Sequence, residues 1–219
     1  MGTTLHELGH AVYDLGVSRD LPWTIRQPSH TLTTEAIAML FGRLSRDASW
    51  MRSAGLVDRD RAEALGAPAA RELRAQMLVF SRWAQVMTRF ERELYRRPDQ
   101  DLNALWWSLK SRHQGLTPPP RPAGAADWAA KIHVVVAPVY YHNYMLGECF
   151  ASQIQSAMRS GLVADTPLVP GDLDAGAWLA QRIFAPGASL HYDDLARAAT
   201  GEAVRPNAFA RQFLEPATA

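Results

Sequence analysis

Hydrophobic residues recur along most of the chain at steps of three, four or seven positions, which is the spacing of amphipathic helices. The longest such run covers residues 69–97, with hydrophobic positions at Leu73, Met77, Phe80, Ala84, Met87 and Leu94. Other helices are expected over residues 3–16, from Thr33 or Thr34 to Leu44, and over 101–113, 140–158, 174–184 and 192–200. No two segments form a convincing strand pair, and no internal repeat is evident. The pattern therefore predicts an all-α fold.

Glycine and proline mark the breaks between these helices. Gly16 suits the end of the first helix, and a polar loop with two prolines follows it. Residues 117–124 contain four prolines and predict a stiff connection without regular structure. Residues 131–137 are ambiguous, because three consecutive valines favour a strand while the residues after them favour a helix. A Pro/Ala-rich tail ends the chain, and with no obvious linker we expect one domain over residues 1–219.

The composition is that of an ordinary globular protein. The 219 residues are 47% hydrophobic and 21% charged, which suffices for one domain with a substantial core. With 23 basic and 22 acidic residues the net charge is +1, so nothing favours binding to nucleic acid or to an anionic membrane. No hydrophobic run approaches the ~20 residues that cross a bilayer. The single cysteine, Cys149, excludes a disulfide within the chain and argues against a thiolate zinc site.

One short motif carries the candidate chemistry. His6-Glu7-Leu8-Gly9-His10 is an HExxH sequence, and its two histidines, four residues apart, share one face of the expected helix. Two imidazoles so placed can bind one zinc ion at about 2.0–2.1 Å. Glu7 lies beside them, where its carboxylate can act as general base and take a proton from the attacking water. An HExxH sequence also occurs by chance on surface helices, so the motif needs a third ligand to support it.

The third ligand predicted is Glu35. A third histidine six residues after His10 would indicate another class of zinc peptidase, but Gly16 occupies that position. Glu35 follows His10 by 25 residues on the next helix, where an acid interrupts a mostly hydrophobic sequence. Two histidines, one glutamate and one open position make a catalytic site for a single zinc ion. Asp14, one turn beyond His10, is either an acceptor for a ligand imidazole or a solvated residue at the helix end.

Several separate blocks resemble the peptidase family of angiotensin-converting enzyme. Besides the HELGH sequence and the stretch from Asp20 to Ile37, the blocks that match in order and approximate spacing are Trp106–Leu109, His113–Pro119, Lys131–His133 and Pro138–Tyr144. The resemblance covers residues 6 to about 155, with Thr200–Gly201 as a further short match. It implies a gluzincin-type helical zinc metallopeptidase. The oligopeptidases of the thimet and oligoendopeptidase type share the zinc site and are the nearest alternative.

The resemblance also implies roles for residues far from the zinc motif. His133 would donate a hydrogen bond to the substrate near the scissile bond, and Tyr144 would stabilise the oxyanion of the tetrahedral intermediate. Tyr141 and Lys131 would hold the C-terminal carboxylate of a small peptide. The implied activity is that of a peptidyl-dipeptidase, which removes dipeptides from the C-terminal end. A purely structural alternative is that His133 is a core histidine and that the tyrosines form a packing stripe.

The chain departs from this family at three positions. Its tyrosine motif is one residue longer, so a second register would give Tyr140 and Asn143 the places assigned to Tyr141 and Tyr144. Asn143 also stands where the animal enzymes carry the arginine of a chloride site, so chloride activation is not predicted. Met39 replaces an acid four residues after the glutamate ligand, which removes a polar partner of the site.

Length is the largest difference from the family. Its members are helical ellipsoids with a deep central channel, and 219 residues cover roughly their C-terminal half or less. A partner chain or a missing N-terminal half would then close the groove around a peptide. Only five residues precede His6, so no targeting segment is visible, and an extracytoplasmic location is suggested by the resemblance alone. The alternative to an enzyme is an inactive, truncated remnant that binds zinc structurally or serves as an interaction module.

Overall fold

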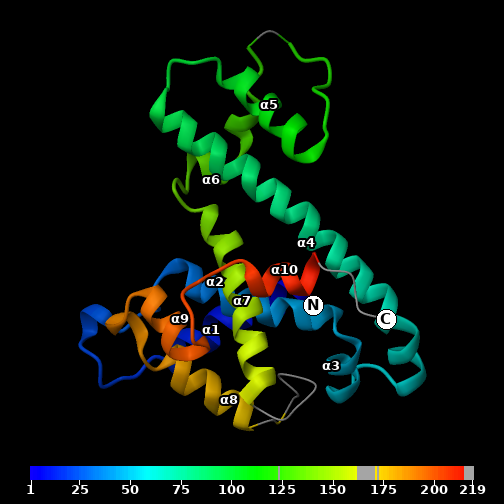
Figure 1. Cartoon of the computed structure of the whole chain (residues 1–219), viewed down its shortest axis with the longest axis vertical. Helices are drawn as coiled ribbons and strands as arrows, with labels where there is room; N and C mark the ends of the chain where they lie inside the picture. Colours follow the sequence, from blue (N-terminus) through cyan, green and yellow to red (C-terminus); the bar gives the residue numbers. More distant parts are fainter. Residues whose placement is uncertain (123, 162–170, 172, 215–219) are drawn as a thin grey trace. The chain divides into compact units, whose positions relative to one another are not determined.

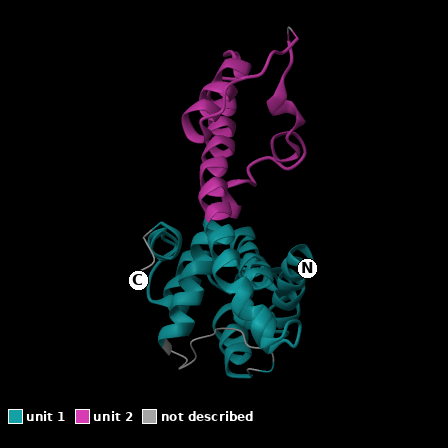
Figure 2. Ribbon diagram, turned by 90° about the vertical axis from the view of Figure 1, so that its right-hand side faces the viewer, with its two compact units in different colours: residues 1–74, 146–219 teal, residues 75–145 magenta. Residues whose placement is uncertain are grey.

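The computed structural model describes residues 1–122, 124–161, 171 and 173–214, and every regular element in these ranges is a helix. The all-α prediction is therefore confirmed. The chain divides into two compact units, which comprise residues 1–74 with 146–219 and residues 75–145 (Figure 2). None of the described helices combines the length and the hydrophobicity needed to span a membrane.

The helices are joined by short connections and labelled in chain order (Figure 1). The α-helices of the described residues are α1 (Gly2–Gly16), α2 (Thr31–Arg43), α3 (Ala48–Ser53), α4 (Arg59–Arg96), α5 (Leu102–Gln114), α6 (Ile132–Val135), α7 (His142–Gly161), α8 (Leu173–Leu179), α9 (Tyr192–Thr200) and α10 (Asn207–Phe213). Short 3-10 turns form η1 (Trp23–Ile25), η2 (Leu44–Arg46), η3 (Asp127–Ala130) and η5 (Gly187–Ser189), and one π-helical turn forms η4 (Ala180–Phe184). Helices α4 and α7 each continue from one unit into the other.

The first unit has a hydrophobic core formed by α1, α2, α7 and α8. Its fully buried side chains sit at helical spacing on each helix, so that one face of each helix turns inward. They include Tyr13, Leu32, Ile37, Phe150, Ile154 and Leu179. Burying a side chain of this size contributes about 1.5–3 kcal/mol, which makes this core the main stabilising element of the unit.

A buried ion pair ties the end of α2 to α7. Arg43 Nε donates to Glu148 Oε2 at 3.0 Å, and the same guanidinium donates to Ser152 Oγ at 3.2 Å. Arg43 and Glu148 are 8% and 5% exposed, so the pair lies out of water. Removing one partner would leave a buried charge uncompensated, at a cost of about 3–5 kcal/mol. The pair therefore fixes the register in which α2 packs against α7.

The second unit has a separate core in which α4 packs against α5. Tryptophans dominate this core: Trp106 is buried and meets the ring of Phe90 edge-on, with 5.2 Å between the ring centroids. Trp83 meets Trp106 in the same way at 5.7 Å. Val134 of α6 is buried against this cluster. The hydrophobic face of α4, whose spacing predicted a long helix, thus forms one wall of this core.

Most predicted helices are confirmed, and four expectations need correction, of which the start of α2 is described separately below. Helix α4 starts at Arg59, ten residues before the predicted start, and contains Pro68, which is exposed and costs one backbone hydrogen bond. The strand considered for the three valines is absent, since Ile132–Val135 is a short helix. The expected tail after residue 200 includes α10, whose aromatic residues Phe209 and Phe213 are buried.

Helix α2 begins earlier than predicted because a histidine caps it. His30 Nδ1 accepts the Leu32 backbone N–H at 3.2 Å, and Thr33 Oγ1 accepts the His30 backbone N–H at 3.2 Å. This reciprocal capping box satisfies two backbone donors at the helix start. Thr33 is therefore the third helical residue and not the cap. The early start adds two or three helical residues before Glu35 and so anchors the segment that carries it.

Candidate metal centre

Helices α1 and α2 bring the three predicted metal ligands together. His6 Nε2 lies 3.6 Å from Glu35 Oε2, and His10 Nε2 lies 3.8 Å from the same oxygen. The two imidazole rings are 4.9 Å apart between centroids and nearly perpendicular. One ligand atom from each of the three residues falls within 4.8 Å of the others. The helix period places the two imidazoles on one face of α1, and the packing of α2 supplies the carboxylate.

Burial differs between the imidazoles and the carboxylate. The Glu35 side chain is 2% exposed, whereas the His6 and His10 side chains are 28% and 27% exposed. A buried carboxylate lies in a medium of low polarity, where a positive partner is worth more than in water. The more accessible imidazoles leave an approach from solvent. The group therefore has a closed side and an open side, as a catalytic metal site requires.

Thr34 orients one of the imidazoles. His10 Nδ1 lies 2.7 Å from Thr34 Oγ1. When Nδ1–H donates to this hydroxyl, the lone pair of Nε2 faces Glu35 and is available to a metal. Asp14, which the sequence offered as a partner for an imidazole, is exposed and has no such contact among the described residues. Of the two alternatives for Asp14, the structure favours the solvated residue.

Two glycines allow the backbones around Glu35 to approach closely. A Cβ atom on Gly9, inside the HExxH sequence, would lie 2.6 Å from Ala38 Cα on α2. A Cβ atom on Gly147 of α7 would lie 3.1 Å from Glu35 Cβ. A methyl group at Gly9 would force α1 and α2 apart, and one at Gly147 would require its neighbours to give by a few tenths of an ångström. Helix α2 is thus held between glycine contacts on both sides, and the position of Glu35 follows from backbone packing.

The donor set and its spacing fit a zinc ion. Atoms bound at about 2.0–2.2 Å to a tetrahedral ion lie about 3.3–3.6 Å from one another, close to the separations of Glu35 Oε2 from the two imidazoles. Two neutral nitrogens and one carboxylate oxygen are also the ligand types that zinc prefers. His6, His10 and Glu35 can therefore hold such an ion, and a fourth position remains for water or substrate.

The predicted general base lies on the same helix as the two histidines. Glu7 is exposed, and no hydrogen bond or ion pair joins it to another described residue. Among the described residues, the Glu7 carboxylate therefore has no structural hydrogen bond or ion pair. A general base must be free to meet the water that it deprotonates, and an exposed glutamate beside two candidate ligands satisfies this requirement.

The other predicted site residues lie in the second unit, where they form an aromatic cluster. His133 Nε2 lies 3.1 Å from the hydroxyl oxygen of Tyr144. The ring of Tyr141 contacts both of these residues, at centroid distances of 5.0 Å to His133 and 5.2 Å to Tyr144. Residues separated by eleven positions thus meet because α6 and the start of α7 pack together. Tyr140 also contacts this cluster, with its ring centroid 5.8 Å from that of His133.

Trp83 joins the predicted substrate-binding residues. Its indole Nε1–H donates to the Tyr141 hydroxyl at 2.5 Å, and the Lys131 ammonium lies 5.9 Å from the centroid of its ring. Burial raises the pKa of Tyr141, so its hydroxyl stays protonated near neutral pH and can donate a hydrogen bond. Sequence reasoning missed Trp83 because it matches the hydrophobic spacing of α4 like any core residue. Thr34 was missed because no pattern marks a hydroxyl beside a ligand.

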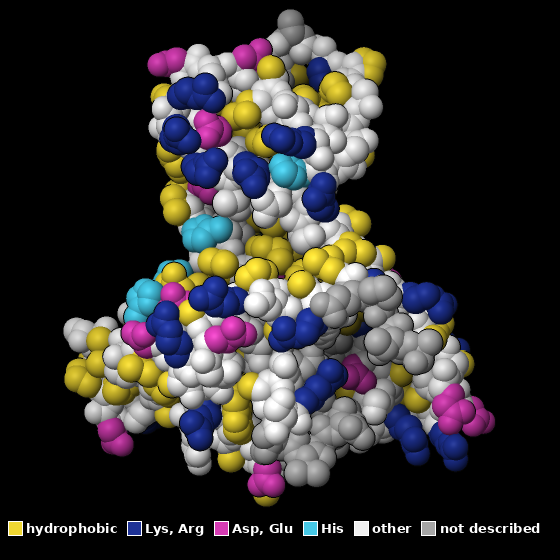
Figure 3. Space-filling model, viewed as in Figure 1, with side chains coloured by type: hydrophobic (Ala, Val, Ile, Leu, Met, Phe, Trp, Pro, Cys, Tyr) yellow, Lys and Arg dark blue, Asp and Glu magenta, His cyan; other side chains and the backbone are white. Residues whose placement is uncertain are grey.

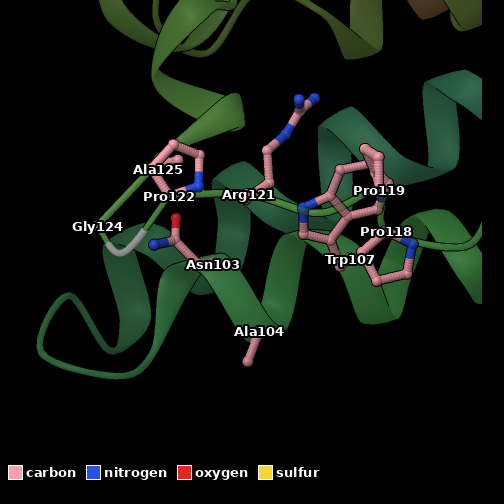
Figure 4. Close-up of a pocket in the computed structure, with 9 residues that line it drawn as sticks. All are labelled: Asn103, Ala104, Trp107, Pro118, Pro119, Arg121, Pro122, Gly124 and Ala125. Carbon is pink, nitrogen blue, oxygen red and sulfur yellow. The ribbon is translucent and has the colours of Figure 1, made fainter.

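A cavity in the second unit lies among the prolines of the stiff connection. It has a volume of about 340 Å³ and is lined mainly by hydrophobic atoms, with Trp107, Pro118 and Pro119 among its walls (Figure 4). Arg121 at its edge is paired with Asp127 at 3.0 Å. None of the predicted site residues lines this cavity. The proline-rich segment is without regular structure in its described part, as predicted.

An all-helical fold with two histidines of an HExxH sequence and a glutamate from the next helix defines a helical metallopeptidase. Residues 1–218 match the family of angiotensin-converting enzyme, and the chain belongs to this peptidase family. No curated protein sequence matches the chain.

Two of the solved structures that share this fold illustrate the likeness. One is titled "BsuCP Crystal Structure" and has 17% sequence identity and a TM-score of 0.74. The other is metallocarboxypeptidase 1 of Trypanosoma cruzi, with 20% identity and a TM-score of 0.73. Each likeness covers 96% of this chain, but only 46% and 49% of the two larger chains. The chain therefore spans about half the length of the structures that it matches.

Proposed function

We propose that the chain hydrolyses peptides with one zinc ion held by His6, His10 and Glu35. The observation that carries this proposal is the convergence of two imidazole nitrogens and one buried carboxylate oxygen within 4.8 Å. A structural zinc site closes with four protein ligands, whereas this group offers three and an open side. The arrangement therefore supports catalysis over a purely structural role for the metal.

The ion, when bound, supplies Lewis-acid polarisation of the peptide carbonyl and makes a nearby water more acidic. Glu7 is the general base in this proposal. Its carboxylate takes the proton of the attacking water and then delivers it to the nitrogen of the leaving amine. The exposed position of Glu7 beside the two imidazoles supports this assignment, because the residue has no described partner that would compete for the proton.

His133 and Tyr144 are proposed to stabilise the substrate near the scissile bond. The Tyr144 hydroxyl donates to the oxyanion, and His133 donates to the substrate beside it. Their mutual distance of 3.1 Å supports a shared role, because each can orient the other. The same contact favours the register that pairs Tyr141 with Tyr144 over the one that begins at Tyr140.

Lys131 and Tyr141 are proposed to bind the C-terminal carboxylate of the peptide. An ammonium and a phenol can both donate to a carboxylate, and both groups lie against Trp83. A substrate end held at a fixed distance from the scissile bond sets the length of the product. The family assignment supports a peptidyl-dipeptidase, in which this product is a dipeptide.

The test is hydrolysis of an N-blocked tripeptide by the purified chain. We expect release of the C-terminal dipeptide, loss of that release with a chelator, and recovery when zinc is added back. Amidation of the C-terminal carboxylate should abolish cleavage. A folded chain that binds zinc but releases no product from any peptide would refute hydrolysis by this chain and favour the remnant.

A second candidate activity is removal of a single C-terminal residue. One structural neighbour is named a metallocarboxypeptidase, which motivates this alternative. The same assay separates the two activities, because a carboxypeptidase would release a free amino acid from the N-blocked tripeptide. Product analysis that finds only the amino acid would replace the dipeptidase assignment and keep the metal site.

A further inference from the structure

Val139 has a strained backbone conformation. Its φ of 57° is the one positive φ of a non-glycine residue in the described ranges. This is the left-handed region, where a side chain branched at Cβ is a clear outlier. Hydrophobic burial does not offset the strain, because the Val139 side chain is 61% exposed. A contact of its backbone therefore has to hold Val139 in this conformation.

The contact is a hydrogen bond to a buried carboxylate. The backbone N–H of Val139 donates to Oε1 of Glu91 on α4, and the Tyr95 hydroxyl donates to the same oxygen at 3.4 Å. In the part of the chain that the structure describes, these two donors are the partners of Glu91, and no basic side chain is among them. Figure 3 shows acidic and basic side chains on the surface of the second unit, whereas Glu91 is 6% exposed.

The burial of Glu91 makes this hydrogen bond important on both sides. A buried carboxylate without a cation depends on its hydrogen-bond donors. A hydrogen bond to an ionised acceptor is also stronger than one between neutral groups. The carboxylate of Glu91 and the strained turn at Val139 therefore stabilise each other.

The strained turn connects the two helices that carry the aromatic cluster. Val139 lies between α6, which contains His133, and α7, which begins with the segment that contains Tyr144. After Val139, the Tyr144 backbone N–H donates to the Tyr141 carbonyl oxygen at 3.3 Å, so the two tyrosines belong to one turn of the backbone. A rotation about φ of Val139 would move both tyrosines relative to His133. It would break the 3.1 Å contact between His133 Nε2 and the Tyr144 hydroxyl.

We propose that Glu91 is a positioning residue, which locks the strained turn at Val139 and thereby holds Tyr141 and Tyr144 against His133. This inference rests on the roles proposed for the two tyrosines in hydrolysis. Glu91 acts through the backbone of Val139 and touches none of the three aromatic residues. Strained residues persist only where the surrounding structure holds them, and they cluster at functional sites.

The first test is a rescue experiment with the N-blocked tripeptide. Glu91→Met fills the same space but removes the acceptor, so Val139 should relax and kcat/KM should fall by about 10–100-fold with zinc content unchanged. Glu91→Gln keeps an acceptor oxygen and should retain most of the activity. Adding Val139→Gly to Glu91→Met should raise kcat/KM again by at least about threefold, because glycine adopts a positive φ without strain.

Glu93→Ala is the matched control for this experiment. It removes a carboxylate of the same helix that pairs with Arg92, Arg96 and Arg97 instead of with the turn. The control should keep the wild-type kcat/KM. An unchanged kcat/KM in Glu91→Met, or a loss that Val139→Gly does not reduce, would overturn the inference and leave the proposed hydrolysis standing.

The second test observes the turn without catalysis. The His133 ring meets the rings of Tyr141 and Tyr144 edge-on, at 5.0 and 5.4 Å, so the NMR signals of its ring protons report on the cluster. These signals should move in Glu91→Met and return when Val139→Gly is added. This pattern in a chain that hydrolyses no peptide would refute the proposed hydrolysis and support the positioning role. Unmoved signals in Glu91→Met would overturn the positioning role.

Hydrogen exchange of the wild-type chain completes the test and needs no substitution. The Val139 side chain is exposed, so its amide should be protected from exchange only if the Glu91 carboxylate holds it. We expect exchange at least about tenfold slower than in an unstructured peptide of the same sequence. An unprotected Val139 amide in the folded wild-type chain would overturn the inference.

Discussion

The metal corner of α1 and α2 and the aromatic cluster of the second unit are assembled by different means. In the metal corner, glycine contacts bring two backbones together, and the side chains of His6, His10 and Glu35 meet because the helices do. In the aromatic cluster, large rings from several helices contact one another, as Trp83 and Tyr141 do. The positions of the functional side chains therefore depend on backbone packing in the metal corner and on side-chain packing in the aromatic cluster. Substitutions should therefore affect the two regions differently.

The largest expected effect is loss of catalysis without loss of metal. Glu7→Gln removes the proton acceptor and leaves both imidazoles in place, so kcat should fall by about 10²–10⁴-fold while zinc binding is kept. Steady-state kinetics and a measurement of bound zinc check this. Asp14→Asn is the matched control, since it alters an exposed acid of the same helix. Full activity of Glu7→Gln would show that another group is the base.

Tyr144→Phe should act on the reaction and leave the fold intact. Removing the hydroxyl deletes a donor to the oxyanion and the contact with His133, so kcat should fall by about 10²–10³-fold with little change in KM or zinc content. Tyr140→Phe is the control, because Tyr140 has no proposed role in the reaction. A large loss in Tyr140→Phe together with an active Tyr144→Phe would reverse the register of the tyrosine motif.

Gly9→Ala should damage the metal corner through the backbone. Its new methyl group would meet Ala38 Cα at 2.6 Å, so α1 and α2 must separate and zinc affinity should fall by at least about tenfold. The free energy of unfolding should drop by about 1–3 kcal/mol. Gly176→Ala serves as the control, since nothing lies within 4 Å of the added atom. Zinc titration and chemical denaturation measure both effects. An unchanged zinc affinity in Gly9→Ala would contradict the backbone account.

Of these substitutions, Thr34→Val should have the smallest effect, which is a weaker binding of zinc. The valine keeps the shape of the side chain but removes the oxygen at 2.7 Å from His10 Nδ1, so the imidazole loses its orienting partner. Zinc affinity should fall by about tenfold, with the unfolding free energy nearly unchanged. Thr34→Ser retains the hydroxyl and should restore the affinity. If serine and valine behave alike, the hydrogen bond has no role in binding.

The residues that meet could be predicted from the sequence for the metal corner but not for the aromatic cluster. The metal group was predictable because its histidines share one helix and its glutamate lies on the next one, so local periodicity sufficed. The partners within the aromatic cluster were not, because Trp83 and Tyr141 are 58 residues apart and only packing brings them together. The valines near His133 indicated a strand, but Val134 is buried by a short helix against the second core. Tertiary contacts outweighed β propensity there.

The most direct test of the account is zinc binding by the wild-type chain and by the Glu35→Gln and Glu7→Gln variants. Competition with a chromophoric chelator gives the stoichiometry and the affinity, and circular dichroism confirms that each variant is folded. We expect one zinc ion per chain in the wild type and in Glu7→Gln, and an affinity lower by at least about 100-fold in Glu35→Gln. A folded Glu35→Gln variant that binds zinc as tightly as the wild type would contradict the proposed metal centre.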